Sequence, residues 1–249
     1  MLNRKKSTLD PFLRSYTKSI GMSMKDSLKY NRTFLEKSLK KIDTIDIWAN
    51  SLQDNDSCTQ LLQELVMDSF TSVVFSFSGL YKYANATLRS SLETSLKVAY
   101  FSKHPIEYGW WKKDKSWQSN VKNVWGTGYD YFKSIENVEV IDKSLKGSGL
   151  FKSGRYTIPR IYSDLSKYVH TGFNRRQMTG ENYSPEFDRD FFRKWNNTYT
   201  EVMRKINLLF ICIFNTEFVS LSSSDKLKIL DVGIDSPRIK TTLLKLYEP

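Results

Sequence analysis

Apolar residues recur along most of the chain at the three- to four-residue spacing of amphipathic helices, and no long stretch alternates with the period of a β-strand. Asp10-Pro11 is a helix-start signal, because a capping side chain precedes a proline at the first helical position. In the region that follows, the apolar positions are Leu28, Leu35, Leu39 and Ile42, and the solvated side carries Lys37, Lys40 and Lys41. We expect one or two N-terminal helices that end near Trp48.

Two more helices are predicted between a polar break at 53–57 and His104-Pro105, where the residue before proline is pushed out of the helical conformation. The first ends or bends at Gly79, and its apolar positions are Leu62, Val66, Phe70, Val73, Phe77 and Leu80. The second has a polar stripe of Arg89, Glu93 and Lys97 beside the apolar positions Leu88, Leu92, Leu96 and Ala99.

A later helix begins at Thr157-Ile158-Pro159, and Ser184-Pro185-Glu186 opens what we expect to be the longest helix of the chain. Short helices are predicted within 106–147, and glycines and serines at 146–154 predict an exposed loop. The pattern as a whole predicts an all-α helical bundle. Its expected parts are an N-terminal helical extension over 1–55, the bundle over 56–218 and a C-terminal tail over 219–249 that packs on the bundle.

Charge favours an anionic partner, because 38 Lys and Arg residues against 27 Asp and Glu give a formal net charge of +11. A solvated lysine-rich surface would give the same excess. Cys58 and Cys212 lie in apolar helical patterns and are expected to be buried, with no disulfide. We expect no metal, no cofactor, no membrane partner and a cytoplasmic location, since no signal peptide or membrane-length apolar run is evident.

His170 is the residue that most suggests chemistry. The helix that precedes it places Ser163, Ser166 or Lys167, and His170 along one side. Arg175-Arg176 follow after a glycine. An imidazole transfers protons near neutral pH and a guanidinium stabilises phosphate charge, so this group predicts a phosphate-handling site. The other interpretation is a histidine that caps a helix C-terminus.

Two segments resemble the HEPN superfamily of all-α domains, in the bacterial branch found among phage-defence and toxin-like proteins. They are Leu88-Arg89-Ser90-Ser91-Leu92-Glu93, continuing to His104-Pro105, and Tyr162-Ser163-Asp164-Leu165-Ser166-Lys167-Tyr168-Val169-His170. The resemblance covers residues 56–218. It implies a HEPN-like bundle that dimerises and, in active members, a metal-independent endoribonuclease. There an Arg and a His a few residues apart act on RNA, and cleavage leaves a cyclic phosphate.

The arginine spacing departs from that family pattern. The nearest arginine before His170 is Arg160, with nine residues between them, which is roughly 15 Å along a helix. The resemblance therefore favours Arg89 as the catalytic arginine, with Glu93 orienting Arg89 or His170. Arg175 and Arg176 remain open as alternatives, and so does an i,i+4 salt bridge between Arg89 and Glu93 on a solvated stripe.

Three further groups have structural interpretations beside functional ones. The Trp- and Lys-rich segment 108–125 would stack on bases if exposed, but burial of its tryptophans in the core is the preferred interpretation. His104 is expected to be structural. Glu64 and Asp68 share a helix face that would suit a metal, although a surface role is preferred. No phosphate-binding glycine loop or nucleophile elbow is present, which removes the usual support for kinases, nucleotide-driven motors and hydrolases.

These features predict a HEPN-like RNA-binding protein, acting as a metal-independent endoribonuclease in phage defence or growth arrest. The expected site has His170, Arg89 and Glu93 as catalytic residues and Ser166, Lys167, Arg175 and Arg176 as substrate-binding residues. The expected partners are RNA (tRNA included) or another nucleic acid or nucleotide, a second copy of the chain, and a neutralising or activating protein. The alternative function is a non-catalytic HEPN-like module that binds a nucleotide or a partner protein in a regulatory role.

Overall fold

The computed structural model describes residues 9–53, 55–114, 129–145, 148–152, 154, 156–169 and 184–247. All the regular structure in these ranges is helical, apart from one isolated bridge between Ser148 and Gly154. The all-α prediction is therefore confirmed. The helices are α1 (Leu9–Ser51), α2 (Asp56–Phe77), α3 (Tyr81–Phe101), α4 (Pro105–Lys113), α6 (Asp130–Lys133), α7 (Glu136–Ser144), α8 (Ile158–Val169), α9 (Arg189–Ile213), α10 (Asn215–Ser220), α11 (Ser223–Lys228), the π-helix η3 (Ile229–Ile234) and α12 (Pro237–Tyr247).

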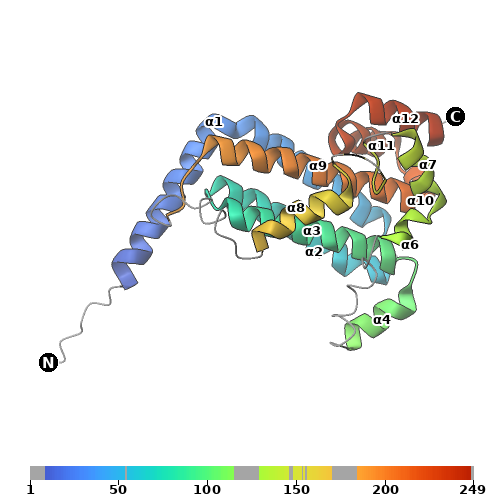
Figure 1. Ribbon diagram of the computed structural model, residues 1–249, viewed down its shortest axis with the longest axis horizontal. Helices are drawn as coiled ribbons and strands as arrows, with labels where there is room; N and C mark the ends of the chain where they lie inside the picture. Colours follow the sequence, from blue (N-terminus) through green and yellow to red (C-terminus); the bar gives the residue numbers. More distant parts are fainter. Residues whose placement is uncertain are drawn as a thin grey trace.

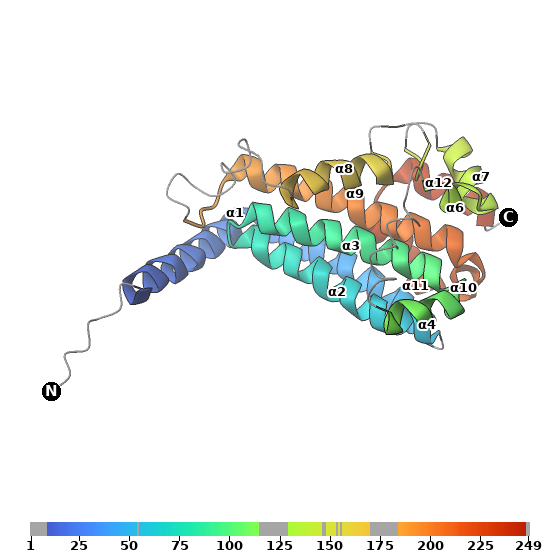
Figure 2. The same cartoon turned by 60° about the horizontal axis from the view of Figure 1, so that its bottom comes forward.

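The long helices α1, α2, α3 and α9 form the body of the bundle (Figures 1 and 2). α2 and α3 form an antiparallel hairpin that turns at Gly79, as the sequence predicts. Gly79 has a φ of +76°, and a Cβ built there would lie 2.4 Å from the carbonyl oxygen of Glu186, so the turn requires glycine. α8 runs along the outside of α3 and α9, while α11, η3 and α12 pack against one end of the bundle.

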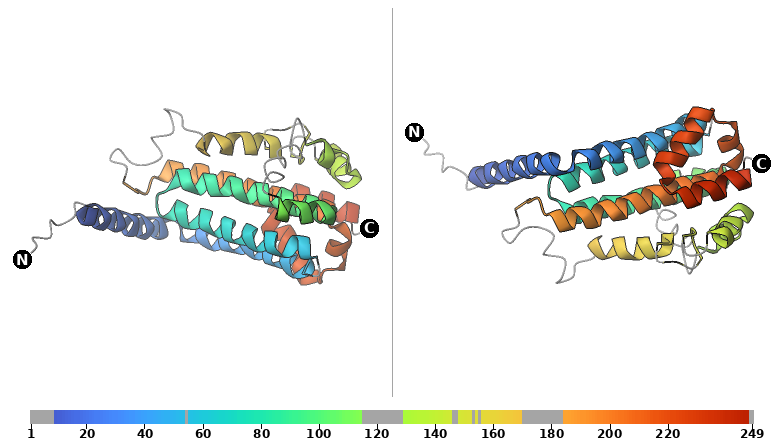
Figure 3. Two further views of the ribbon diagram at one scale, coloured as in Figure 1. Left: turned by 90° about the horizontal axis from the view of Figure 1, so that it is seen from below. Right: turned by 90° about the horizontal axis from the view of Figure 1, so that it is seen from above.

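The first part of α1 extends past the other end of the bundle (Figure 3), and the helix bends at Asn31. The predicted apolar stripe is wrong at two positions, because Leu28 and Leu39 are exposed. The packed face carries Ile42, as predicted, together with Ser23, Ser27, Asn31, Ser38 and Ile45. Because most of these buried side chains are small and polar, a pattern of apolar residues does not identify this face.

Lys41 is buried, although its position in the pattern predicts solvent. Its ammonium group donates to the carbonyl oxygen of Val232 at 2.7 Å and to the carboxylate of Asp235 at 3.2 Å. Both partners come from the η3 region, which covers this side of α1. The error arises because burial here is created by a segment almost two hundred residues away in the chain.

α9 begins later than the sequence pattern predicts. Its first residue is Arg189, and the carboxylate of Asp188 caps it by accepting from the backbone N–H of Phe191 at 2.7 Å. With 25 residues it is longer than either part of α1, which non-helical backbone at Asn31 divides, so among the described helices the prediction that it is the longest continuous one is confirmed. Its apolar face is buried along the bundle, and Trp195, Tyr199 and Phe210 lie at the centre of the core.

Residues 149–151, which precede α8, are buried, whereas the glycines and serines around them predict an exposed loop. Leu150 and Phe151 are buried, and the backbone N–H groups of residues 150–152 donate to the carboxylate of Asp142 on α7. The ammonium group of Lys205 on α9 donates to the carbonyl oxygens of Ser148 and Gly149 at 2.7 and 2.9 Å. Two buried charged residues therefore fix the path of the chain into α8.

Lys205 is expected to make the free energy of unfolding rise with pH in the alkaline range. Burial lowers the pKa of Lys205 to about 8, from 10.5 when exposed. Between these two pH values the unfolded chain binds a proton that the folded chain has lost, so this residue makes the free energy of unfolding rise with pH. Lys205→Met removes that rise. Urea unfolding of both proteins across this pH window measures it, and identical pH profiles would contradict the assignment.

Both cysteines are buried and unpaired, as predicted. Burial raises the pKa of the Cys58 thiol to about 12, which makes it unreactive near neutral pH. None of the described helices combines the length and the apolar content needed to cross a membrane.

Candidate functional site

A hydrogen-bonded network joins α3 to α8, and Arg89 is its centre. Nε of Arg89 donates to Oγ of Ser166 at 3.1 Å, and Nη2 donates to Glu93 at 2.7 Å. Nη2 also donates to the hydroxyl oxygen of Tyr162 at 2.5 Å. In addition, the guanidinium carbon Cζ of Arg89 lies 4.8 Å from the centre of the Tyr162 ring. Because these partners come from two helices, Arg89 fixes how α8 lies on α3.

Tyr162 completes the network, since its hydroxyl donates to Glu93 at 2.7 Å. Burial, followed by the hydrogen bond to Glu93, raises the pKa of Tyr162. Burial raises the pKa of the nearby Tyr129 to about 12, and the negative charge of Glu93 adds to this effect. Both phenols therefore stay protonated near neutral pH and do not act as bases.

The network lies partly open to solvent. The side chain of Arg89 is 21% exposed and that of Glu93 is 27% exposed. Among the described residues, Nη1 of Arg89 has no hydrogen-bond partner, while Nε and Nη2 are both used. The site thus presents one edge of a guanidinium whose position is already fixed by its neighbours, which is the arrangement that binds a phosphate or carboxylate oxygen well.

The structure brings together Arg89, Glu93 and Ser166 among the predicted site residues. The predicted i,i+4 pair of Arg89 and Glu93 exists, but it faces α8 and is not a solvated stripe. Lys167 points elsewhere and pairs with Asp164 on the exposed side of α8. His170 directly follows the last residue of α8, and it lies outside the described residues with Arg175 and Arg176.

Tyr162 is the network residue that the sequence pattern does not select. By spacing it falls with Ile161 and Leu165 on the apolar side of α8. A signal was nevertheless present. Tyr162 and Ser166 are one helical turn apart, and Ser166 donates back to the carbonyl oxygen of Tyr162 at 2.8 Å. Two polar groups at this spacing beside an apolar stripe mark the edge at which α8 meets α3.

Other candidate groups have structural roles where the structure describes them. His104 stacks on Tyr100 with ring centres 4.1 Å apart, and its Nδ1 lies 2.8 Å from the Tyr100 carbonyl oxygen. Trp111 packs against Phe101, but Trp110 is exposed, so the prediction of burial is wrong at Trp110. Trp117 and Trp125 lie outside the described residues.

In the described part of the chain, no three His, Cys, Asp or Glu side chains come together in a geometry that could hold a metal ion. Asp68 is half-buried, and burial raises its pKa.

Comparisons of the chain with protein-family models, with curated proteins and with solved structures find no match.

Proposed function

We propose that the chain is a HEPN-like RNA-binding protein in which Arg89, Glu93 and His170 cut RNA without a metal ion. The observation that carries the proposal is the network between α3 and α8, because these helices contain most of the two segments on which the resemblance rests. The net charge of +11 supports an anionic partner.

In the proposed reaction the imidazole of His170 takes the proton from a ribose 2′-hydroxyl. The 2′ oxygen then attacks the adjacent phosphorus, the bond to the 5′ oxygen of the next nucleotide breaks, and a cyclic phosphate remains. The leaving 5′ oxygen takes a proton from water, and the proton held by His170 returns to the solvent. Arg89 stabilises the negative charge that builds up on the phosphate oxygens, using the edge of its guanidinium that carries Nη1. Glu93 holds Arg89 in place and is a positioning residue.

A second candidate function is a non-catalytic module, and one observation favours it. Glu93 neutralises the charge of Arg89, and Ser166 and Tyr162 occupy two of its nitrogens. An arginine used in this way joins two helices whether or not it binds a phosphate. In this alternative the basic surface recognises a nucleotide or a partner protein, and no bond is broken.

The test compares wild type with His170→Ala on tRNA and on single-stranded RNA in the presence of EDTA. We expect wild type to produce fragments with cyclic phosphate ends, and the variant to cleave about 10²- to 10⁴-fold more slowly, because a general base is lost. Equal cleavage by both proteins would remove His170 from the mechanism. RNA binding by both without cleavage would instead favour the non-catalytic module.

The proposal includes a homodimer that brings two copies of the site together, and a role in phage defence or growth arrest under the control of a neutralising or activating protein. Growth of cells that express wild type or His170→Ala is a second measurement of the same chemistry. Expression of wild type should slow growth, and expression of His170→Ala should not.

A further inference from the structure

The first part of α1, residues 9–22, is an arm that extends past the end of the bundle (Figure 3). Ser23 marks the root of the arm, because a Cβ built on Gly79 in the α2–α3 turn would lie 2.6 Å from the Oγ of Ser23. At the rise of an α-helix the arm is roughly 20 Å long. No described helix lies beside it in either view of Figure 3.

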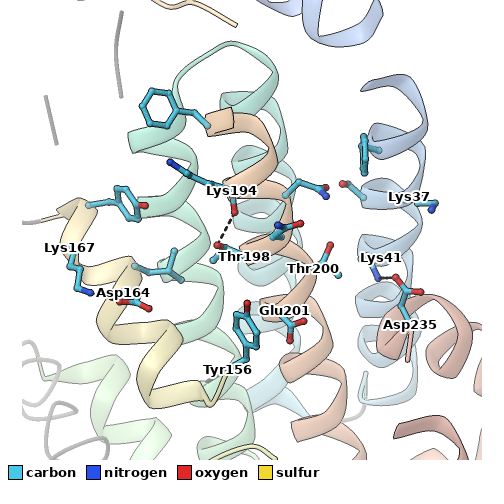
Figure 4. Close-up of a pocket in the computed structure, with 17 residues that line it drawn as sticks. Lys37, Lys41, Tyr156, Asp164, Lys167, Lys194, Thr198, Thr200, Glu201 and Asp235 are labelled. Atoms are coloured by element: carbon cyan, nitrogen blue, oxygen red, sulfur yellow. Dashed lines mark hydrogen bonds and ion pairs between the residues drawn. The ribbon is translucent and has the colours of Figure 1, made fainter. Parts of the chain in front are cut away.

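Along the bundle, by contrast, the packed side of α1 is covered by other parts of the same chain. The ring of Phe34 lies edge-on to that of Phe192 on α9, with the ring centres 6.1 Å apart. Lys41 reaches the carboxylate of Asp235 at 3.2 Å, beside a groove of about 850 Å³ between α1, α8 and α9 (Figure 4). This side of α1 is therefore occupied wherever the bundle reaches it.

The packed side continues along the arm as a seam made of Leu13, Tyr16 and Ile20. These residues are three and four positions apart, and the same spacing continues into Ser23 and Ser27, which the bundle buries. It is the spacing of the side chains that two helices bury against each other in a coiled coil. Leu13 is 48% exposed, and Tyr16 and Ile20 are partly exposed. The arm thus presents a helix-pairing seam beyond the point where the bundle covers it.

The cations of the arm lie away from the seam. Arg14 and Lys18 are exposed and one turn apart on the opposite side of the helix, and Lys25 continues their row. A partner that meets the seam therefore meets no cation, so two copies of the arm do not repel each other there. The same placement gives the seam no attraction for the anionic surface of a membrane or a nucleic acid.

The bundle also restricts how a partner approaches, because it lies on the seam side of the arm, where it buries Ser23 and Ser27. A flat membrane surface would meet the bundle before it reached the seam. A second arm is a single helix about 10 Å wide, and it fits if its own bundle lies at the far end. Two arms can therefore pair along their whole length only when they run antiparallel.

We propose that two copies of the chain associate through their arms, as an antiparallel pair of helices with a twofold axis near Tyr16. Leu13 of each copy packs against Ile20 of the other, and the two Tyr16 rings meet at the axis. The contact is short for a stable dimer, so the dimer dissociates on dilution into the low micromolar range. It does not depend on the proposed function, since Arg89 and His170 lie outside α1. A contact that brings two copies of that site together would use a different surface.

Sedimentation equilibrium of the full chain over about 1–100 μM measures the association. Leu13→Lys places a charge in the seam of both copies, and we expect it to weaken the dimer at least about tenfold. The matched control is Met22→Lys, which replaces another exposed apolar residue of the arm, 57% exposed, on the side away from the seam. It should stay within about twofold of wild type. All three proteins should unfold at the same temperature, because both substituted side chains are exposed.

Disulfide cross-linking tests the antiparallel arrangement. Cys58 and Cys212 are the only cysteines of the chain and both are buried, so Tyr16→Cys introduces a single accessible thiol at the expected axis. Mild oxidation should link the two copies through it, whereas Lys18→Cys, on the side away from the seam, should stay unlinked.

A wild-type protein that is monomeric over the whole concentration range would overturn the proposal, whether or not it binds vesicles of anionic lipid. Equal weakening by Leu13→Lys and Met22→Lys, or equal cross-linking of the two cysteine variants, would overturn it as well. So would a dimer that Leu13→Lys leaves intact, because the copies would then associate through another surface. None of these measurements involves RNA cleavage, so their outcome is separate from that of the proposed function.

Discussion

Replacing Asp142 by alanine is expected to lower the free energy of unfolding by about 3–5 kcal/mol, a large part of the stability of a domain of this size. The buried carboxylate accepts from the backbone N–H of Phe151 at 3.1 Å and of Lys152 at 2.9 Å, and also from that of Leu150. Alanine leaves the N–H groups of Leu150 and Phe151 buried without this acceptor. It also removes a negative charge that favours the protonated form of buried Lys205.

The effect should extend to the candidate site, because the turn that Asp142 holds leads directly into α8. The backbone N–H of Ile158, the first residue of α8, donates to the carbonyl oxygen of Leu150 at 2.8 Å. Chemical denaturation of wild type and variant measures the change in stability. The matched control is Glu139→Ala, one turn earlier on α7, where the carboxylate is exposed and pairs with Lys143 and Lys152. That variant should unfold near the wild-type midpoint, and equal losses in both variants would show that burial of Asp142 has no special effect.

Local sequence patterns predicted the helices well where a single apolar stripe determines burial. The buried positions Leu88, Leu92 and Leu96 of α3 follow the pattern directly. The predictions failed where distant segments create the burial. Lys41 is covered by the η3 region, and the turn that contains Leu150 is drawn inward by Asp142 and Lys205. A pattern read along one helix contains no information about a partner that arrives from another part of the chain.

The site was predictable to the extent that it depends on helical spacing. Arg89 and Glu93 are one turn apart on a polar stripe, and that stripe does face α8. Tyr162 was missed because a tyrosine counts as apolar in a periodicity argument, although its hydroxyl is what connects Glu93 to α8. Lys167 is predicted beside Ser166, but the orientation of α8 that brings Ser166 to Arg89 leaves Lys167 exposed and paired with Asp164.

Arg89→Lys is expected to slow RNA cleavage about 10²- to 10³-fold, if the proposed function is right, while the protein stays folded. Lysine keeps the positive charge, so Glu93 keeps a cation beside it. A single ammonium group cannot reproduce the planar fork that reaches Ser166, Glu93 and Tyr162 together and still presents a free edge to a phosphate. Cleavage assays in EDTA and thermal unfolding of the same preparation separate a loss of activity from a loss of fold.

The matched control is Arg193→Lys on α9, an exposed arginine that pairs with Asp190. It should cleave RNA at the wild-type rate, because replacing an exposed arginine in a surface ion pair changes little. Wild-type cleavage by Arg89→Lys would reduce Arg89 to a helix-joining residue and would leave Arg175 or Arg176 as the arginine that accompanies His170. A fall in thermal stability with unchanged cleavage per folded molecule would lead to the same conclusion, because Arg89 would then act only through the packing of α8 on α3.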